Sequence, residues 1–515
     1  MILLNIKYKR NFKLKSCSMN FNYGSDKLTL KKIMQLEQGL RRGFLLPEVI
    51  SGIHKNNEII RNIVHSKKAV YGINTGFGPL CDTLISAKET NTLQRNLLIT
   101  HAVGVGKPIE KKLSKIMMIC KVHALCQGYS GIRLKVIERI LDFIENDLIP
   151  VVPEQGSVGA SGDLAPLSHL FLPLIGEGEF WINNEIVDAK KVLLEHNLEP
   201  IVLEAKEGLA LINGTQFILA HTLVGLEKMN YILDLADVAG AMSLEGFQGS
   251  AAPFKNALHE IRPFKGSQEV AKRMRLLLKD SENLNAHKNC NRVQDPYSIR
   301  CIPQVHGASR NAYYHLKKLA TIELNAVTDN PIILSDSEII SGGNFHGQPL
   351  AIALDYVSVA ASELGNISDR RCYLLLDGKY GLPRLLTEKG GVNSGYMIPQ
   401  YTTAALVSEN KSLCFPPSAD SVPTSLGQED HVSMGSISGR KFNQILGNLE
   451  RILAIELMYA AQALEFRGSH KCSTIIEKNH RLIRSKVPKL EEDRLLKNDI
   501  NSMIKMVTNQ SFSVN

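Results

Sequence analysis

The stretch FNQILGNLERILAIELMYAAQAL, residues 442–464, has the pattern of one long helix. Its apolar residues recur three and four positions apart, which places them along a helical face: Ile445, Leu449, Ile452, Leu453, Leu457 and Ala460. Alanine and leucine also occupy its other faces, as in a helix that has neighbours on several sides. This pattern predicts a helix at the centre of a bundle.

Three further stretches carry the same spacing, residues 113–124, 308–327 and 350–364. Strand-like runs are few and short, such as residues 180–187 with a turn at Asn183-Asn184. The sequence therefore predicts a mainly α-helical protein with a long central helix bundle and a smaller N-terminal domain. The predicted divisions are a disordered basic extension over residues 1–18, an N-terminal domain over 19–225, and a helical bundle with a C-terminal helical region over 226–515.

Composition excludes several classes of protein. The 515 residues are 22% charged and 44% hydrophobic, as in a globular chain. Residues 1–18 hold five basic and no acidic side chains, so the other 497 carry only +4 of the formal net charge of +9, which argues against nucleic-acid binding. The nine cysteines form no C-x-x-C pair, which suits a reducing cytoplasm. The longest apolar runs fall short of the roughly 18 residues of a membrane span, so we expect no membrane segment.

Small residues are densest in GSVGASGDLAP, residues 156–166. A serine-hydrolase nucleophile elbow is disfavoured there, because Asp163 stands where the second glycine of G-x-S-x-G belongs. A phosphate-binding loop is disfavoured as well, because the G-K-[ST] ending is missing. Neither of these common functions therefore explains the small residues around Ser161.

Two hypotheses for this segment stay open. In the first it is a tight turn, and Asp163 caps the helix that Pro166 opens. In the second Gly162, which has no Cβ, lets its nitrogen approach the Ala160 carbonyl, so that the chain closes into a ring. Loss of water from that ring and from the Ser161 hydroxyl would leave a methylene conjugated to a carbonyl, which is an electrophile.

Six motifs of the chain resemble those of the aromatic amino acid ammonia-lyases and follow the order of that family. They are YGINTGFG at 71–78, GSVGASGDLAPLSH at 156–169, EGLALINGTQ at 207–216, QDPYSIR at 294–300, SGGNFH at 341–346 and QEDHVSM at 428–434. The resemblance covers roughly residues 19–466 and is most specific in these loops. It implies a fumarase/aspartase-like helical fold and a homotetramer in which the subunits share each active site.

The resemblance also implies a prosthetic group made from the chain itself. Ala160, Ser161 and Gly162 are expected to cyclise to 4-methylidene-imidazole-5-one (MIO), carried by the N-terminal domain. An amine leaves poorly and a β-proton is weakly acidic, so ammonia elimination needs an electrophile and a base together. Tyr71, which opens its glycine-rich loop, resembles the catalytic tyrosine of the family and is the expected base for the β-proton.

The segment around Arg300 is expected to bind the substrate carboxylate. A guanidinium matches a carboxylate with two parallel hydrogen bonds. If the chain is helical after Pro296, Gln294 and Tyr297 would share the face of Arg300. The resemblance implies that all three residues lie in the active site, with Tyr297 as a catalytic residue and Gln294 and Arg300 as substrate-binding residues.

His101 and Glu429 bear on the choice of substrate, because an imidazole ring needs polar partners that a phenyl ring does not. The resemblance implies that Thr100-His101 with Glu429 selects histidine, although Ser is usual where this chain has Thr100. Relatives that act on phenylalanine have apolar side chains at the position of His101. The predicted function is elimination of ammonia from L-histidine to give trans-urocanate, with Glu429 among the catalytic residues. The alternatives are the same chemistry on tyrosine or phenylalanine, a 2,3-aminomutase, and a non-catalytic helical scaffold.

Two more residues complete the site that the resemblance implies. Asn213 is expected as an amide donor near the ring and the substrate carboxylate, and Phe345 as a packing wall. His306, His346 and His431 lack the spacing of metal ligands, so no metal is predicted. No pyridoxal-lysine context or nucleotide-binding motif stands out, so MIO is the only prosthetic group expected.

Overall fold

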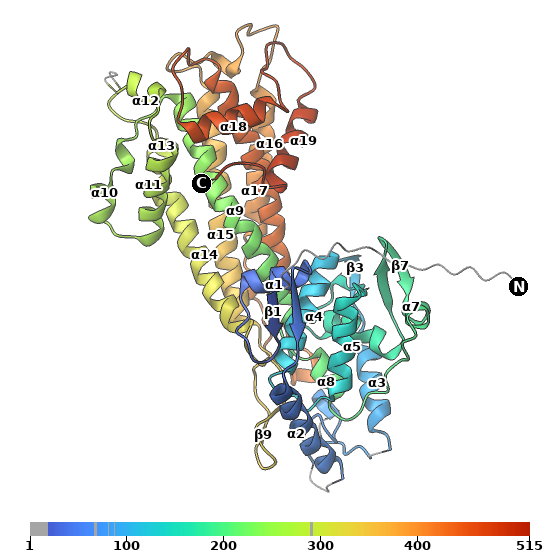
Figure 1. The fold of residues 1–515 in the computed structure, drawn as a ribbon. Helices are drawn as coiled ribbons and strands as arrows, with labels where there is room; N and C mark the ends of the chain where they lie inside the picture. The colour runs from blue at the N-terminus through green and yellow to red at the C-terminus, as the bar shows by residue number, and fades with distance from the viewer. Residues whose placement is uncertain (1–18, 66–68, 81, 87, 289–291, 515) are drawn as a thin grey trace, which may run out of the picture.

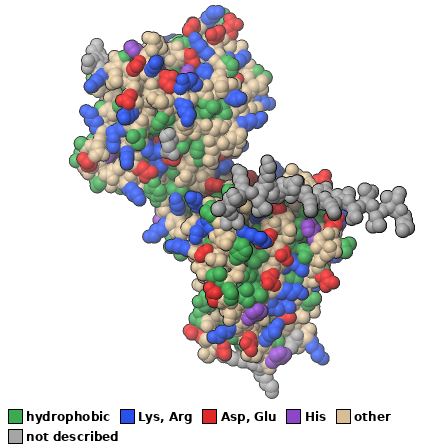
Figure 2. Space-filling view, in the orientation of Figure 1, with side chains coloured by type: hydrophobic (Ala, Val, Ile, Leu, Met, Phe, Trp, Pro, Cys, Tyr) green, Lys and Arg blue, Asp and Glu red, His purple; other side chains and the backbone are tan. Residues whose placement is uncertain are grey.

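The computed structural model describes residues 19–65, 69–80, 82–86, 88–288 and 292–514, so the expected basic extension lies outside the described residues. The chain forms two lobes (Figure 1): an N-terminal lobe, residues 19–215, and a long helix bundle that leaves it and carries smaller helices at its far end. Acidic and basic side chains are interspersed over the visible face of both lobes (Figure 2).

Four long helices build the bundle: α9 (Gln216–Phe247), α14 (Ile302–Glu323), α15 (Gln348–Leu376) and α17 (Gly435–Leu464). Helix α9 packs against the other three, and α15 packs against both α14 and α17. Every residue of α17 from Ile452 to Ala463 is buried, which is roughly three turns of helix. The prediction of a mainly helical protein with a central bundle is confirmed.

Helix α14 ends at Glu323, before the expected helix end at Val327, and the loop that follows it docks on the N-terminal lobe. The Asn325 side chain accepts from Leu28 N at 2.8 Å and donates to Leu28 O at 2.9 Å, so it joins the two lobes. The loop then forms a short antiparallel hairpin, β8 (Ile332–Ile333) and β9 (Ile339–Ile340).

The N-terminal lobe combines short helices with two- and three-stranded sheets. The predicted hairpin near residues 180–187 is confirmed, with Asn183 and Asn184 both at positive φ, as a two-residue turn of this hand requires. In chain order the elements are β1 (Met19–Asn22), α1 (Leu30–Glu37), β2 (Arg41–Phe44), α2 (Pro47–Val64), η1 (Gly78–Leu80), α3 (Thr90–His101), β3 (Val105–Pro108), α4 (Lys111–Leu125), α5 (Leu134–Glu145), β4 (Ile149–Pro150), β5 (Pro153–Gln155), α6 (Leu164–Phe171), η2 (Leu172–Ile175), β6 (Glu179–Ile182), β7 (Glu185–Asp188), α7 (Ala189–Glu195) and α8 (Glu207–Ile212).

Smaller helices flank the bundle. They are η3 (Ala252–Phe254), α10 (Asn256–Glu260), α11 (Lys265–Leu277), α12 (Glu282–Ala286), α13 (Tyr297–Arg300), η4 (Arg384–Leu386), α16 (Met397–Leu413), η5 (Pro417–Ala419), η6 (Ser425–Gly427), α18 (Thr474–Arg484) and α19 (Leu496–Thr508). The proposed domain boundary at residue 225 falls inside α9, which runs without a break from the N-terminal lobe into the bundle.

Helix α15 is the one helix of the described chain that is as long and apolar as a membrane span. In this structure 67% of its apolar window is buried inside the protein. It packs between other bundle helices, and Arg371 on α15 pairs with Glu456 on α17 in the interior at 2.5 Å. The six cysteines that the structure describes are all free.

A buried ion-pair network ties α9 to α14 and α11. Asp237 accepts from Arg310 Nη2 at 2.6 Å, from Arg273 Nε at 2.8 Å and from His306 Nδ1 at 2.8 Å. Burial alone raises the pKa of Asp237, but the bond from His306 and the charges of Arg310, His306 and Arg273 outweigh it, so the pKa falls from 3.8 to about 2. The carboxylate therefore stabilises the bundle at neutral pH, and this contribution is lost as the pH falls from about 4 to about 2.

We expect Asp237→Asn to lower the free energy of unfolding by about 3–5 kcal/mol, because it leaves two arginines without their buried partner. Urea denaturation would measure this loss, and the variant's stability should depend less on pH below about 4. Asp234→Asn is the matched control, since Asp234 lies one turn earlier, binds Arg310 at 2.8 Å and is partly exposed. Equal losses in the two variants would contradict the role given to Asp237.

Candidate functional site

The segment around Ser161 presses directly against another stretch of backbone. Ser161 and Gly162 have φ of 38° and 81°. Gly214 lies beside them: its N–H donates to Ser161 O at 3.4 Å, and its carbonyl accepts from Asp163 N at 2.7 Å. A Cβ on Gly162 would lie 2.2 Å from Gly214 O. Only glycine fits at residue 162, so the segment meets the requirement of a ring-forming Ala-Ser-Gly sequence.

Asp163 ties this segment to the first turn of α9. Its Oδ2 accepts from Phe217 N at 3.1 Å and Ile218 N at 3.0 Å, and its Oδ1 accepts from Ser157 Oγ at 3.3 Å. Asp163 does occupy the N-cap position of α6, and its carbonyl accepts from Leu167 N at 3.0 Å, but its side chain makes no bond to the start of that helix. Burial raises the pKa of Asp163 to about 7, although these hydrogen bonds favour the ionised form.

Replacing Asp163 separates its hydrogen bonding from its charge. Asp163→Ala would leave two buried N–H groups of α9 unpaired, and we expect it to lower the free energy of unfolding by about 1–3 kcal/mol for each group. Asp163→Asn keeps an acceptor oxygen of the same shape and should lose far less. Thermal or urea unfolding compares the two, and equal stability of both variants would exclude this role of Asp163 at the start of α9.

Glu429 joins Ser161 from a distant part of the sequence. Ser161 Oγ donates to Glu429 Oε1 at 3.1 Å. The other carboxylate oxygen accepts from Thr424 Oγ1 at 2.8 Å and Ser425 Oγ at 2.9 Å, so the side chain is held from both sides. Ser161 and the acid predicted to hold an imidazole are therefore neighbours in one chain.

His101, the last residue of α3, belongs to the same cluster, since the charge of Glu429 acts on it. Its Nδ1 lies 2.8 Å from Leu97 O, which can only accept, so we assign the Nδ1 hydrogen to that bond. Burial lowers the pKa of His101, while the Leu97 carbonyl and the Glu429 charge oppose this shift. The ring is thus neutral at pH 7, and Nε2 is left as a hydrogen-bond acceptor.

The Tyr71 loop reaches the same end of the molecule. Gly72 has φ of 72°, and a Cβ on it would lie 2.4 Å from Leu209 Cδ2, so the loop is packed tightly against α8. Helix η1, which follows the loop, contacts η6, which precedes Glu429. Tyr71 itself is half-buried.

Asn213 and the Phe345 loop complete this group. The Asn213 side chain donates to Asn330 O at 2.9 Å, and its backbone carbonyl accepts from Lys121 Nζ. Gly347, two residues after Phe345, would place a Cβ 2.6 Å from Ile218 Cδ1, so the loop lies against the first turn of α9. Residues Tyr71, His101, Asn213, Phe345 and Glu429 therefore come from elements gathered at the Ser161 end of the bundle.

The predicted carboxylate-binding residues lie at the other end. Ser250 N donates to Asp295 Oδ2 at 2.6 Å, which holds this segment beside the C-terminus of α9. The 32 residues of α9 span about 48 Å at 1.5 Å per residue, with Asp163 at the start. Within one chain Gln294, Tyr297 and Arg300 are therefore far from Ser161.

In this segment helix α13 begins at Tyr297. Gln294 therefore lies before the helix and does not share a helical face with Arg300. Tyr297 is 71% exposed, and the Arg300 guanidinium lies over its ring, 4.5 Å from the centroid. Arg300 Nε is buried without a hydrogen-bond partner in the described chain.

Sequence reasoning missed several supporting residues. Thr424 and Ser425, which hold Glu429, have no pattern of their own, because their role depends on the turn between them and the acid. Lys121 had a signal: it interrupts the apolar run MMICKVHAL at 117–125, where a charge needs a reason.

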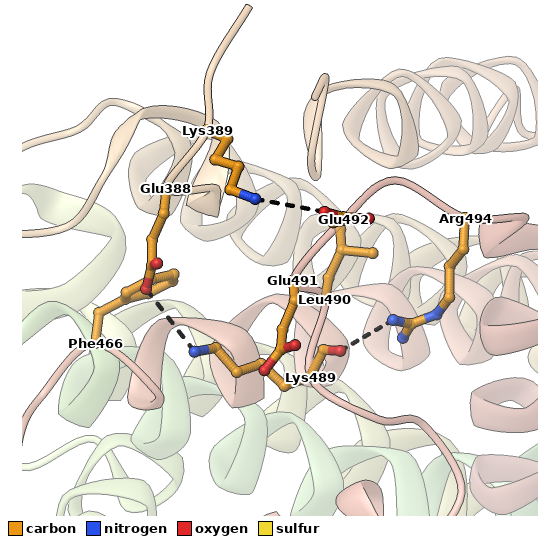
Figure 3. A pocket seen from close by; sticks show the side chains of 8 residues that line it. All are labelled: Glu388, Lys389, Phe466, Lys489, Leu490, Glu491, Glu492 and Arg494. Atoms are coloured by element: carbon orange, nitrogen blue, oxygen red, sulfur yellow. Dashed lines mark hydrogen bonds and ion pairs between the residues drawn. The ribbon is translucent and has the colours of Figure 1, made fainter. Parts of the chain in front are cut away.

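A separate pocket of about 440 Å³, seen from close by in Figure 3, is set apart from the Ser161 cluster: it lies at the opposite end of α17. Met434 N, where α17 starts, donates to Val158 O at 2.9 Å, whereas the pocket includes Phe466, just past its end. Its two lysines pair with two of its acids, Lys389 with Glu492 at 3.4 Å and Lys489 with Glu388 at 3.9 Å. It is lined by Glu388, Lys389, Phe466, Lys489, Leu490, Glu491, Glu492 and Arg494, none of them a predicted site residue. Among the described residues no cluster of His, Cys, Asp or Glu is arranged to hold a metal ion.

A helical bundle with a bare Ala-Ser-Gly turn, an acid and a neutral histidine at one end defines a class of lyase. The model of the aromatic amino acid lyase family matches residues 28–485, and the chain belongs to this family. It is 46% identical to a histidine ammonia-lyase of Symbiobacterium thermophilum over 94% of this chain and 95% of that one. The crystal structure of histidine ammonia-lyase from Trypanosoma cruzi aligns with a TM-score of 0.87 and 41% identity, covering 96% of this chain and 94% of that one. A tyrosine aminomutase from Streptomyces globisporus aligns with a TM-score of 0.90 and 32% identity, covering 96% and 98%.

Proposed function

We propose that this protein is a histidine ammonia-lyase, which eliminates ammonia from L-histidine without oxidation and releases trans-urocanate. The observation that carries the proposal is the hydrogen bond of Ser161 to Glu429, at the end of the bundle where α3 also ends with the neutral His101. Glu429 offers an anionic acceptor and His101 a neutral one, which together match the polar ring of the substrate better than a phenyl ring. The histidine ammonia-lyases among the relatives support the same substrate.

The electrophile would come from Ala160, Ser161 and Gly162. The Gly162 nitrogen bonds to the Ala160 carbonyl carbon, and the Ala160 oxygen leaves as water with the amide hydrogens of Gly162 and Ser161. The Ser161 hydroxyl leaves as a second water with the Ser161 Cα hydrogen. The resulting MIO group supplies an electrophilic methylidene carbon. The contact of Gly162 with Gly214, too close for any Cβ, supports this assignment.

The remaining residues bind and orient the substrate in this proposal. Arg300 forms the fork for the carboxylate, Tyr297 and Gln294 line that half of the site, and Tyr71 removes the β-proton. Asn213 is an amide donor near the MIO ring and the substrate carboxylate, and Phe345 is a packing wall of the site. We expect a cytoplasmic enzyme that needs no metal, pyridoxal cofactor, nucleotide, membrane or nucleic acid.

Glu429→Gln should lower kcat/KM for L-histidine by roughly ten- to a hundredfold, because a hydrogen bond to a charged group is worth about 1.5–3 kcal/mol. His101→Phe should act in the same direction and improve the relative turnover of L-phenylalanine. Product formation from L-histidine, L-tyrosine and L-phenylalanine, followed by ultraviolet absorbance, measures both effects.

Two controls accompany this measurement. Asp430→Asn changes the neighbouring exposed acid and should leave turnover unchanged, whereas Ser161→Ala should abolish it. Product from tyrosine or phenylalanine alone would overturn the substrate. A β-amino acid would identify an aminomutase, and no product from any of the three would favour a scaffold.

The proposed enzyme is a homotetramer whose active sites are shared between subunits. Helix α9, about 48 Å long, separates the two groups of site residues, so a second chain is needed to bring them together. An exposed apolar stripe on α15 supports such packing: Ile352, Tyr356 and Val359 recur at helical spacing on one side of the bundle.

Co-expression of two inactive variants tests the sharing. Ser161→Ala and Arg300→Met damage opposite halves of the site, and each alone should be inactive. Mixed tetramers should recover about a quarter of the wild-type activity, the chance that both halves are intact after equal mixing. Mixtures that remain as inactive as the single variants, despite confirmed mixed assembly, would show that each chain builds its own site.

A further inference from the structure

Lys121 is a buried charge that the proposed chemistry leaves unused. It lies on α4, where the side chain is 2% exposed and the flanking Met117 and Met118 are fully buried. In the described chain its ammonium makes one hydrogen bond, to Asn213 O, and no ion pair. By contrast Lys206, also buried, pairs with Asp329 at 2.7 Å. Burying an ammonium without a carboxylate is costly, so the single contact is the feature to explain.

That contact fixes one end of a backbone clamp. Asn213 is held by its carbonyl through Lys121 and by its side chain through Asn330 O at 2.9 Å. The next residue, Gly214, makes the two backbone bonds to Ser161 and Asp163 and fills the space beside Gly162. Only the Asn213–Gly214 peptide separates the lysine from the ring-forming segment.

We propose that Lys121 is a positioning residue for the cyclisation of Ala160, Ser161 and Gly162. Its ammonium holds the Asn213 carbonyl, so Gly214 keeps the left-handed turn at Ser161 and Gly162 from relaxing before the ring closes. Ring closure is intramolecular, so its rate depends on how well the reacting groups are held. This inference rests on the proposed function, because it presupposes that the ring forms.

Burial also lowers the pKa of Lys121 to about 7; the charge of Asp329 raises it and that of Lys206 lowers it further. With a pKa near neutral pH, Lys121 can be an ammonium or a neutral amine. Both forms donate a hydrogen bond to a carbonyl, whereas an apolar side chain does not. A hydrogen-bond donor of lysine length is therefore what the clamp requires.

The test compares Lys121→Met with the wild-type protein. Mass spectrometry of the proteolytic peptide that contains Ala160 to Gly162 measures the fraction that has lost two waters, at set times after purification at fixed temperature. Lys121→Met should cyclise roughly ten- to a hundredfold more slowly, and Lys121→Arg, which keeps N–H donors, should recover part of that rate.

Ile119→Ala is the matched control, since Ile119 is fully buried on the opposite face of α4 and its truncation destabilises the same helix. It should lower the unfolding midpoint without slowing cyclisation. Complete cyclisation of Lys121→Met at the wild-type rate would overturn the proposal, and so would equal slowing in Ile119→Ala.

A second variant and the wild-type peptide distinguish failure of this proposal from failure of the proposed function. If Lys121→Met does not fold, Lys121→Gln replaces it: its amide is one atom too short for the Asn213 carbonyl, so slow cyclisation supports the proposal and the wild-type rate overturns it. A wild-type peptide that retains both waters would instead refute the proposed function, and the role of Lys121 with it.

Discussion

The contact between Gly162 and Gly214 is the constraint on which the rest of the site depends. A Cβ at residue 162 has no space, so the two backbones approach as closely as they do only because residue 162 is glycine. Their hydrogen bonds hold Ser161 beside Glu429, and Asp163 then receives the first N–H groups of α9. The Ala-Ser-Gly turn and the start of the main bundle helix are therefore one structural unit.

Helix α9 then determines where everything else lies. Its first turn is bound to Asp163, its middle is tied to α14 through Asp237, and its last turn meets the segment that carries Tyr297 and Arg300. Because the helix is continuous and mostly buried, it keeps the two groups of predicted site residues at opposite ends of the chain. Under the proposed function, the same helix that stabilises the bundle thus prevents one chain from closing a complete site by itself.

Much of this architecture could be predicted from the sequence. The apolar spacing of residues 442–464 predicted a helix, which is buried on every side from Ile452 to Ala463, and Asn183-Asn184 predicted the hairpin turn, because local patterns determine both. The neighbouring positions of Ser161, His101 and Glu429 came from the family resemblance and could not come from periodicity, since they lie on separate loops.

Other features depend on contacts between distant segments, which no local pattern records. Asp163 stands at the start of α6 in the sequence yet binds α9, because the turn at Gly162 redirects its side chain. The early end of α14 follows from the docking of Asn325 on Leu28. The role of Lys121 likewise emerges only when α4 is seen beside Asn213.

The length of α9 also has a consequence for how the protein behaves in a cell. In the proposed assembly a newly made chain carries two incomplete halves, so activity rises with subunit concentration more steeply than the amount of protein does. A subunit damaged at one end still contributes a sound half to its neighbours. Mutations at opposite ends of the helix can then compensate for each other between two alleles, whereas two mutations at the same end cannot.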